Sequence, residues 1–229
     1  SQILKKMYPK GISLPRYYPA FIDVKDKTCV VIGGGDFGEE KVVKLLECDA
    51  SVRVISTHVN KSVSEMAQKG TIEWLKRTYQ AGDLSDAFIA IAADNPEDVN
   101  LKIAEEATER NVPLNVVDVT HLCTFIAPSV ARRGEVTVAT STGGASPALA
   151  RTFREKVESD CPCRMLEYAD LAPILSWARG VVREKGWNIV PSYWQNCINE
   201  DLLDLVQEGR DAEAQAHLIN CLEKGNTNN

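Results

Sequence analysis

Apolar and polar positions alternate along the first half of the chain with two different periods. Short β-branched and apolar runs predict buried strands, and stretches with an apolar stripe every three to four residues predict helices. The run 87–93, AFIAIAA, is apolar on both faces, as a central strand of a parallel sheet should be. Strands are expected at 28–35, 50–56, 72–79 (a short or edge segment), 87–93 and 113–119, and helices after the glycines at 33–38, at 62–70 and at 96–111. This alternation predicts an α/β fold with a parallel, doubly wound sheet.

The pattern changes in the second half. Residues 123–142 predict two extended segments around a turn at Arg133-Gly134, with no helix between them. Ser146 as cap and Pro147 at the first helical position predict a helix over 146–159, and helical patterns continue to about 223. We therefore expect a nucleotide-binding domain at 1–125, a β region at 126–147 and a helical domain at 148–229.

Composition narrows the possible classes of protein. The 229 residues carry a net charge of -6, which argues against a nucleic-acid partner, and no apolar run approaches the roughly 20 residues of a membrane span. The seven cysteines are odd in number and form no C-x-x-C pair, so the sequence predicts no disulfide framework and favours a reducing cytoplasm. Cys161 and Cys163 stand too close together for the usual zinc spacing.

Gly33, Gly35 and Gly38 fit the pattern G-x-G-x-x-G between a predicted strand and a predicted helix. In this pattern the first glycine permits a tight turn, the second lets a pyrophosphate approach, and the third lets the helix pack close to the strand. The helix start then offers unpaired N–H groups to the phosphates. The turn predicts dinucleotide binding, and a purely structural turn is the alternative.

The acid that usually binds the cofactor ribose is missing, because no Asp or Glu occurs between Ser51 and Ser64. Ser56, Thr57 and His58 stand where adenosine contacts are expected. A hydroxyl or N–H group there could hold the ribose of NAD, whereas His58 and Lys61 could favour a 2′-phosphate. The choice between NAD and NADP stays open at this point.

Two further groups of residues are candidates for substrate chemistry. Asp118 ends a strand at the edge where ligands bind, with Asn115 three residues earlier, and could exchange a proton beside a hydride transfer; the alternative is a turn cap. His121 and Cys123 supply only two potential ligands, so no metal site is predicted. A hydroxyl- and glycine-rich stretch before a helix, with basic residues around it, predicts an anion site: Ser141, Thr142, Gly143, Gly144 and Ser146, with Arg132, Arg133, Arg151, Arg154 and Lys156. The alternative is a solvated basic face.

Four segments in order, YYPAFIDVKDKTCVVIGGGDFGEEKVVKLL, AFIAIAADNPEDVN, NVVDVTHLCTFIAPS and STGGASPALARTFREKVE, resemble precorrin-2 dehydrogenase, the dehydrogenase/ferrochelatase module of siroheme synthase. The resemblance covers roughly 15–160. It implies a Rossmann-type NAD-binding domain, a β dimerisation region and a helical domain in a homodimer. The implied reaction oxidises the tetrapyrrole precorrin-2 to sirohydrochlorin with NAD, and some members also insert Fe²⁺.

Carried over by position, the resemblance implies that Asp118 is the catalytic aspartate. It implies cofactor contacts from Gly33 to Gly38 with Asp36 and Phe37 at the helix start, and contacts at Ala93 and Asp94 in the second segment. Ser141 and Thr142 fall on its hydroxyl-Gly-Gly motif, and some relatives have a phosphorylated serine where Thr142 stands. Chelatase activity stays open, and a non-catalytic NAD-sensing module is the rival hypothesis.

Overall fold

The computed structural model describes residues 17–159 and 164–226, so Cys161 and Cys163 lie outside the described residues. Contacts divide the chain into two compact units. The first contains the described residues up to Ala127 together with Gly143–Ala145. The second contains Pro128–Thr142 and the described residues from Ser146 onward.

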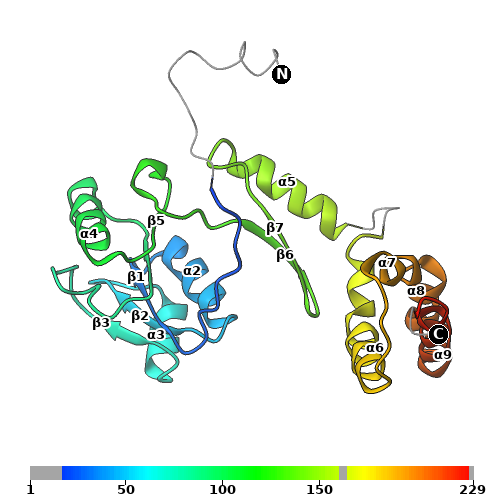
Figure 1. Ribbon diagram of the computed structural model, residues 1–229. Helices are drawn as coiled ribbons and strands as arrows, with labels where there is room; N and C mark the ends of the chain where they lie inside the picture. The colour runs from blue at the N-terminus through cyan, green and yellow to red at the C-terminus, as the bar shows by residue number, and fades with distance from the viewer. Residues whose placement is uncertain (1–16, 160–163, 227–229) are drawn as a thin grey trace, which may run out of the picture. The chain divides into compact units, whose positions relative to one another are not determined.

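A five-stranded parallel sheet is the centre of the first unit (Figure 1). Its order is β3-β2-β1-β4-β5, so the chain first builds outward from β1 and then crosses to the other side. The predicted α/β class and parallel sheet are confirmed, and the segment at 72–79 contains a three-residue edge strand. The strands are β1 (Thr28–Ile32), β2 (Ser51–Ile55), β3 (Glu73–Leu75), β4 (Ile89–Ala92) and β5 (Leu114–Val116).

Two apolar layers cover the two faces of this sheet. The helices are α2 (Asp36–Leu46), α3 (Lys61–Gln68) and α4 (Glu97–Arg110). Successive residues of a strand point to opposite faces. Val31 joins the cluster that contains Val42 of α2 and Val63 of α3, whereas its neighbour Ile32 joins the cluster that contains Ile103 of α4. Burial on both faces explains why the strands read as continuous apolar runs rather than as alternating ones.

The second unit begins with a hairpin of β6 (Ser129–Arg133) and β7 (Val136–Thr140), on which α5 (Pro147–Glu158) packs (Figure 1). The predicted turn is confirmed, with Gly134 at φ +52°. The predicted cap is also confirmed, because the Oγ of Ser146 accepts a hydrogen bond from the N–H of Leu149 at 3.2 Å. The hydroxyl of Thr140 donates to the carbonyl of Ala150 at 3.0 Å and ties the hairpin to the helix.

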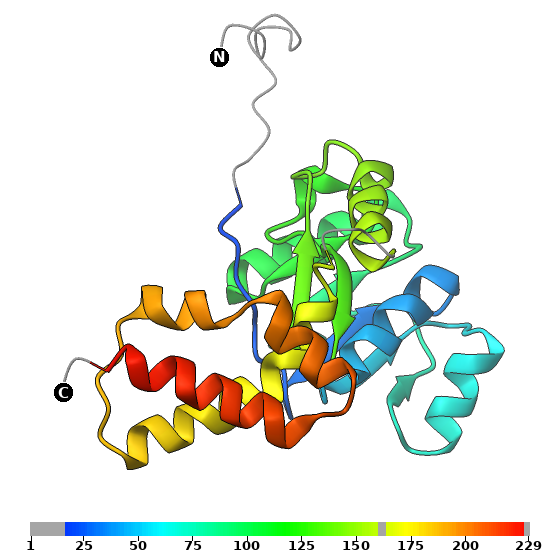
Figure 2. The ribbon, with the colours of Figure 1, turned by 90° about the vertical axis from the view of Figure 1, so that its right-hand side faces the viewer.

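A group of short helices follows in the same unit (Figure 2). Helix α9 packs against α6, α7 and α8, and Leu202, Leu203, Leu218 and Leu222 are completely buried between them. Within the described ranges, no helix has the length and apolar character needed to cross a membrane. The elements are η2 (Glu167–Leu171), α6 (Ala172–Glu184), α7 (Pro191–Cys197), α8 (Glu200–Gln207) and α9 (Asp211–Lys224).

One cysteine pair corrects the sequence-based expectation. Cys197 at the end of α7 and Cys221 in α9 form a disulfide across 24 residues of sequence. The expectation of no disulfide framework is wrong for these two, and their bond removes the support that this expectation gave to a reducing compartment. Their spacing matches no short motif, because only the packing of α7 on α9 brings them together.

We expect reduction of this disulfide to destabilise the helices of the second unit. Closing a loop of this length restricts the unfolded chain and contributes about 3 kcal/mol. Urea unfolding followed by circular dichroism should show a lower midpoint with a reductant than without it. A Cys197→Ala/Cys221→Ala variant should unfold at one midpoint under both conditions, whereas Cys48→Ala should respond as the unmodified chain does. Equal midpoints for the unmodified chain would contradict the expectation.

Candidate functional site

A glycine turn joins the carboxyl end of β1 to the start of α2. Gly33 adopts φ +120°, and a Cβ built there would lie 1.8 Å from the carbonyl oxygen of Ala93. At Gly38 a Cβ would lie 2.4 Å from the carbonyl oxygen of Gly33. The turn therefore presses against the end of β4 on one side and against its own helix on the other, and neither position accepts a side chain.

The two middle glycines face the loops around the turn. A Cβ at Gly34 would lie 2.4 Å from Cγ1 of Val59, and the carbonyl of Gly34 accepts a hydrogen bond from the N–H of Asn60 at 2.9 Å. A Cβ at Gly35 would lie 2.9 Å from a carboxylate oxygen of Asp94. Gly35 is also the first flanking residue of α2, so the N–H groups of that helix start beside it. Bare backbone is what a pyrophosphate needs for close approach.

A pocket of about 430 Å³ opens beside this turn, at the carboxyl ends of β1, β2, β3 and β4. In open α/β sheets, ligands bind at this edge. Six residues predicted to contact the cofactor line it: Gly33, Gly35, Ser56, Thr57, His58 and Asp94.

The other four predicted cofactor residues are not among those that line the pocket. Ala93 and Gly38 are buried beneath it, and Asp36 and Phe37 are exposed in the first turn of α2. Several lining residues were missed, because they come from loops whose sequence carries no motif. A search of every loop that follows a predicted strand would have found Asn60, Thr78, Tyr79, Asn95 and Pro96.

The polar residues after β2 are bonded to one another. The hydroxyl of Ser56 donates to the carbonyl of His58 at 2.5 Å, and Oγ1 of Thr57 lies 3.0 Å from Nδ1 of His58. The indole N–H of Trp74 donates to the carbonyl of Ser56 at 2.9 Å and fixes the start of this loop. Thr57 and His58 are exposed side by side at the pocket.

No lysine or arginine occurs among the described residues that line this pocket. The nearest arginines in the sequence are engaged with acids. Arg53 contacts Glu73 at 2.5 Å and Asp86 at 2.8 Å, and Arg77 contacts Asp83 at 2.7 Å. A doubly charged phosphate in the pocket would therefore have no guanidinium or ammonium partner from the lining.

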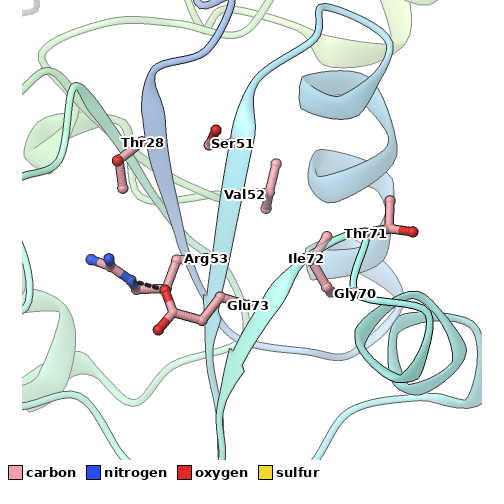
Figure 3. Close-up of a pocket in the computed structure, with 8 residues that line it drawn as sticks. All are labelled: Thr28, Ser51, Val52, Arg53, Gly70, Thr71, Ile72 and Glu73. Carbon is pink, nitrogen blue, oxygen red and sulfur yellow. Dashed lines mark hydrogen bonds and ion pairs between the residues drawn. The ribbon is translucent and has the colours of Figure 1, made fainter.

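A second hollow, of about 280 Å³, lies at the opposite edge of the sheet, where β1, β2 and β3 begin (Figure 3). Figure 3 shows the Arg53 guanidinium turned onto the carboxylate of Glu73 beside it. This edge carries the amino ends of the strands, away from the glycine turn, and its cation is already paired. The hollow is explained by the short edge strand and needs no ligand.

Asp118 stands in the loop after β5, at the same edge of the sheet as the glycine turn. It is exposed and has a left-handed backbone, with φ +60°. Such a conformation costs a non-glycine residue free energy, although Asp tolerates it better than most. A residue held in it is a candidate for function.

The surrounding loop is closed by several hydrogen bonds. The Cys123 sulfur accepts from the N–H of Val116 at 3.2 Å, and the Oγ1 of Thr124 accepts from the N–H of Leu114 at 2.7 Å. The amide of Asn115 is buried and donates to the carbonyl of Phe125 at 3.1 Å. Asn115, predicted to bind substrate, thus stabilises the loop that carries Asp118.

His121 lies in η1 (Thr120–Leu122), inside this loop, and Cys123 follows it. Burial raises the pKa of the Cys123 thiol above its usual value. Among residues 17–159 and 164–226, no group of three or more His, Cys, Asp or Glu side chains is arranged to hold a metal ion.

The predicted anion-binding residues divide between the two units. Gly143 and Gly144 belong to the first unit, where a Cβ at Gly144 would lie 3.1 Å from Cγ2 of Thr120. In the second unit, Oγ1 of Thr142 accepts from the N–H of Ser146 at 2.9 Å and lies 3.0 Å from its carbonyl oxygen. Ser141 is exposed at the end of β7.

The predicted basic residues are partly neutralised. Arg133 forms a two-pronged contact with Asp170, at 2.9 and 2.5 Å, and Arg154 contacts Glu158 at 3.1 Å. Arg132 at the end of β6 and Arg151 on α5 have exposed side chains.

Comparisons with known proteins agree with this architecture. Residues 20–129 match a family described as "Putative NAD(P)-binding". Siroheme synthase of Ruthia magnifica subsp. Calyptogena magnifica is 34% identical over 88% of this chain, and siroheme synthase 1 of Serratia proteamaculans is 34% identical over 91%. These alignments cover 43% and 44% of the two relatives, so the chain spans less than half their length.

A solved structure titled "SirC, precorrin-2 dehydrogenase" aligns with a TM-score of 0.67, covering 91% of this chain and all of that one. The sequences are 22% identical in this alignment, so the likeness concerns the fold.

We expect Gly33→Ala to destabilise the first unit strongly. The added methyl group would meet the backbone of Ala93, and φ +120° is unfavourable for alanine, so a loss of about 3 kcal/mol or more is expected. Gly82→Ala is the matched control, because Gly82 has φ +101° and no atom within 4 Å of an added Cβ. Urea unfolding should give a smaller loss, of about 1 to 2 kcal/mol, for this control. Equal losses for both variants would contradict the role given to the Ala93 contact.

Proposed function

Because the chain belongs to the family of the N-terminal dehydrogenase module of siroheme synthases, we propose that it oxidises precorrin-2 to sirohydrochlorin with NAD⁺. One observation carries the proposal. A pocket built on a glycine turn and an exposed, left-handed Asp118 lie at the carboxyl edge of the same sheet. The first is suited to hold a hydride acceptor and the second to accept a proton, which are the two requirements of a dehydrogenation.

The domain at 20–129 is of the NAD(P)-binding kind, and we propose NAD as its cofactor. The 2′-phosphate of NADP would enter the loop after β2, where Thr57 and His58 are exposed. The pocket lining offers it no lysine or arginine among the described residues. Lys61 begins α3 nearby, but its side chain is 91% exposed and lies 3.8 Å from Glu65. A ribose hydroxyl needs no cation, so these residues favour NAD.

In the proposed mechanism, the glycine turn from Gly33 to Gly38 would hold NAD⁺, which would supply the hydride acceptor, and the chain's own residues handle the proton. The carboxylate of Asp118 accepts the proton that the macrocycle releases. One C–H bond of the substrate loses its hydrogen as hydride, and a second bond to hydrogen loses its hydrogen as this proton. The products are sirohydrochlorin, NADH and a proton. The closed loop around Cys123 and Thr124 keeps Asp118 in one conformation, which saves the cost of ordering it in each cycle.

The substrate is a polycarboxylate, and we propose that Arg132 and Arg151 bind its carboxylates. Guanidinium groups form two-pronged hydrogen bonds with carboxylates, and both side chains are exposed. Ser141, Thr142, Ser146 and the intervening Gly143-Gly144 pair are proposed to supply hydroxyl and N–H donors.

Assembly, location and metal chemistry complete the proposal. We propose a homodimer formed through the β region at 126–147, working in the cytoplasm. Leu149 and Phe153, which are 48% and 51% exposed on α5 next to this region, support a subunit contact there. Fe²⁺ would be a second substrate if the same site also serves metal insertion, with Asp118 accepting the pyrrole N–H protons.

The proposed reaction predicts production of sirohydrochlorin and NADH from precorrin-2 and NAD⁺. Because the 2′-phosphate lacks a cationic partner, kcat/KM with NADP⁺ should be at least about tenfold lower. Absorbance of both products checks this, and addition of Fe²⁺ to the product tests chelatase activity. Binding of NAD⁺ without turnover, and without any tetrapyrrole absorbance shift, would favour a non-catalytic NAD-sensing module instead.

Asp118→Asn should lower kcat by about 10²- to 10⁴-fold and leave the Kd for NAD⁺ unchanged, because asparagine tolerates the left-handed backbone but cannot accept the proton. Asp49→Asn is the matched control, since Asp49 is also exposed and left-handed, with φ +58°, in the turn before β2. It should retain full activity. Wild-type turnover by Asp118→Asn would remove Asp118 from the mechanism.

A further inference from the structure

The connection between β3 and β4 is built more elaborately than a surface link requires. Residues 76–88 contain no helix, although a parallel crossover commonly has one. Two of them, Thr78 and Tyr79, line the pocket beside the glycine turn. The loop is closed internally by Asp83, which accepts hydrogen bonds from the Arg77 guanidinium at 2.7 and 2.8 Å and from the N–H of Gln80 at 2.8 Å.

Glu106 of α4 also anchors this loop through hydrogen bonds. This carboxylate is only 7% exposed. It accepts hydrogen bonds from the hydroxyl of Tyr79, from the N–H of Gly82 at 2.9 Å and Leu84 at 3.2 Å, and from Nε of Arg110 at 2.7 Å. Burial alone would raise the pKa of Glu106, but these donors outweigh it and hold the pKa below its usual value. A buried carboxylate with four donors is a rigid anchor.

Tyr79 connects this anchor to the pocket. Its ring packs against the apolar cluster of Leu84 and Ile103, and it lines the pocket together with Ile55 and Val99. Burial and the hydrogen bond to Glu106 raise the pKa of the phenol well above its usual value, so the hydroxyl keeps its proton and donates it. The hydroxyl of Tyr79 is thus fixed by Glu106, and its ring is fixed by the apolar cluster.

The end of the cofactor that Tyr79 would meet follows from the sheet order. β3 is the edge strand beside β2, on the side away from β4 and β5. The loop after β2 is where a dinucleotide's adenosine ribose binds, so the loop after β3 borders the adenine. An aromatic ring offers a purine a stacking surface regardless of charge.

We propose that Tyr79 forms the wall of the adenine subsite and that Glu106 is its positioning residue. This inference rests on the NAD(P) pocket of the proposed function, and it adds a residue that contacts no cofactor atom yet sets cofactor affinity. Glu106 acts through Tyr79, so its removal should weaken binding of the adenosine end and leave the chemical step alone. A merely structural anchor would instead change stability and the active fraction, and kcat with it.

The test measures binding of NAD⁺ and of ADP-ribose to the full chain by calorimetry, with kcat and KM for NAD⁺ from precorrin-2 turnover. Glu106→Gln and Tyr79→Leu should each weaken both ligands about tenfold and raise KM, with kcat at saturating NAD⁺ within about twofold of wild type. Tyr79→Phe, which keeps the ring but loses the bond to Glu106, should weaken binding by a smaller factor. Glu105→Gln, the same change on the exposed neighbour in α4, should bind as wild type does.

A double variant decides whether Glu106 acts through the ring. In a Tyr79→Leu background, Glu106→Gln should weaken ADP-ribose binding by less than about twofold more, because the group it positions is gone. Full additivity overturns the inference. Wild-type affinity of Tyr79→Phe and Tyr79→Leu also overturns it, and that result can be obtained even if Glu106→Gln fails to fold. The result is separable from the proposed function. If wild type binds ADP-ribose but does not oxidise precorrin-2, the function falls and the subsite stands, whereas absence of binding to wild type overturns both.

Discussion

The first unit depends on the close approach of Gly33 to the carbonyl of Ala93. The turn after β1 can descend to this distance, 1.8 Å from where a Cβ would stand, only because no Cβ is present. This contact joins the ends of β1 and β4. The order in which the chain adds strands to the sheet reverses between these two strands. A second close approach of this kind occurs at Gly38 in the first turn of α2, where an added Cβ would meet the carbonyl oxygen of Gly33. The absence of side chains in the turn allows this close packing, and it also leaves bare backbone lining the pocket.

The elements were predictable where the relevant interactions are local. Burial of a strand on both faces leaves a continuous apolar run, so 87–93 indicated its central position directly. The turn at Arg133-Gly134 and the cap at Ser146 were likewise set by neighbouring residues. β3 was the weakest of the predicted strands, because an edge strand of three residues has too few positions to establish a period.

The site was predictable only in part, because its walls come from segments far apart in the sequence. Tyr79 carries no signal until β3 is placed beside β2. Glu106 did carry one, since it falls on the apolar stripe of α4 with Ile103 and Ala107, where an acid should not stand unless something satisfies it. The Cys197–Cys221 pair had no such signal, because it is a product of helix packing in the second unit.

Two carboxylates at the same sheet differ in environment, and the difference separates a structural acid from the proton acceptor that we propose. Glu106 is buried and accepts four hydrogen bonds. Its carboxylate oxygens are therefore occupied by these donors and are not available to a reacting proton. Asp118 is exposed, and its loop is closed through Cys123, Thr124 and Asn115 rather than through its own carboxylate. These hydrogen bonds therefore close the loop around Asp118 and leave its side chain available. This arrangement suits the proton acceptor that we propose, because a donor that fixed the oxygens of Asp118 would compete with the substrate for them.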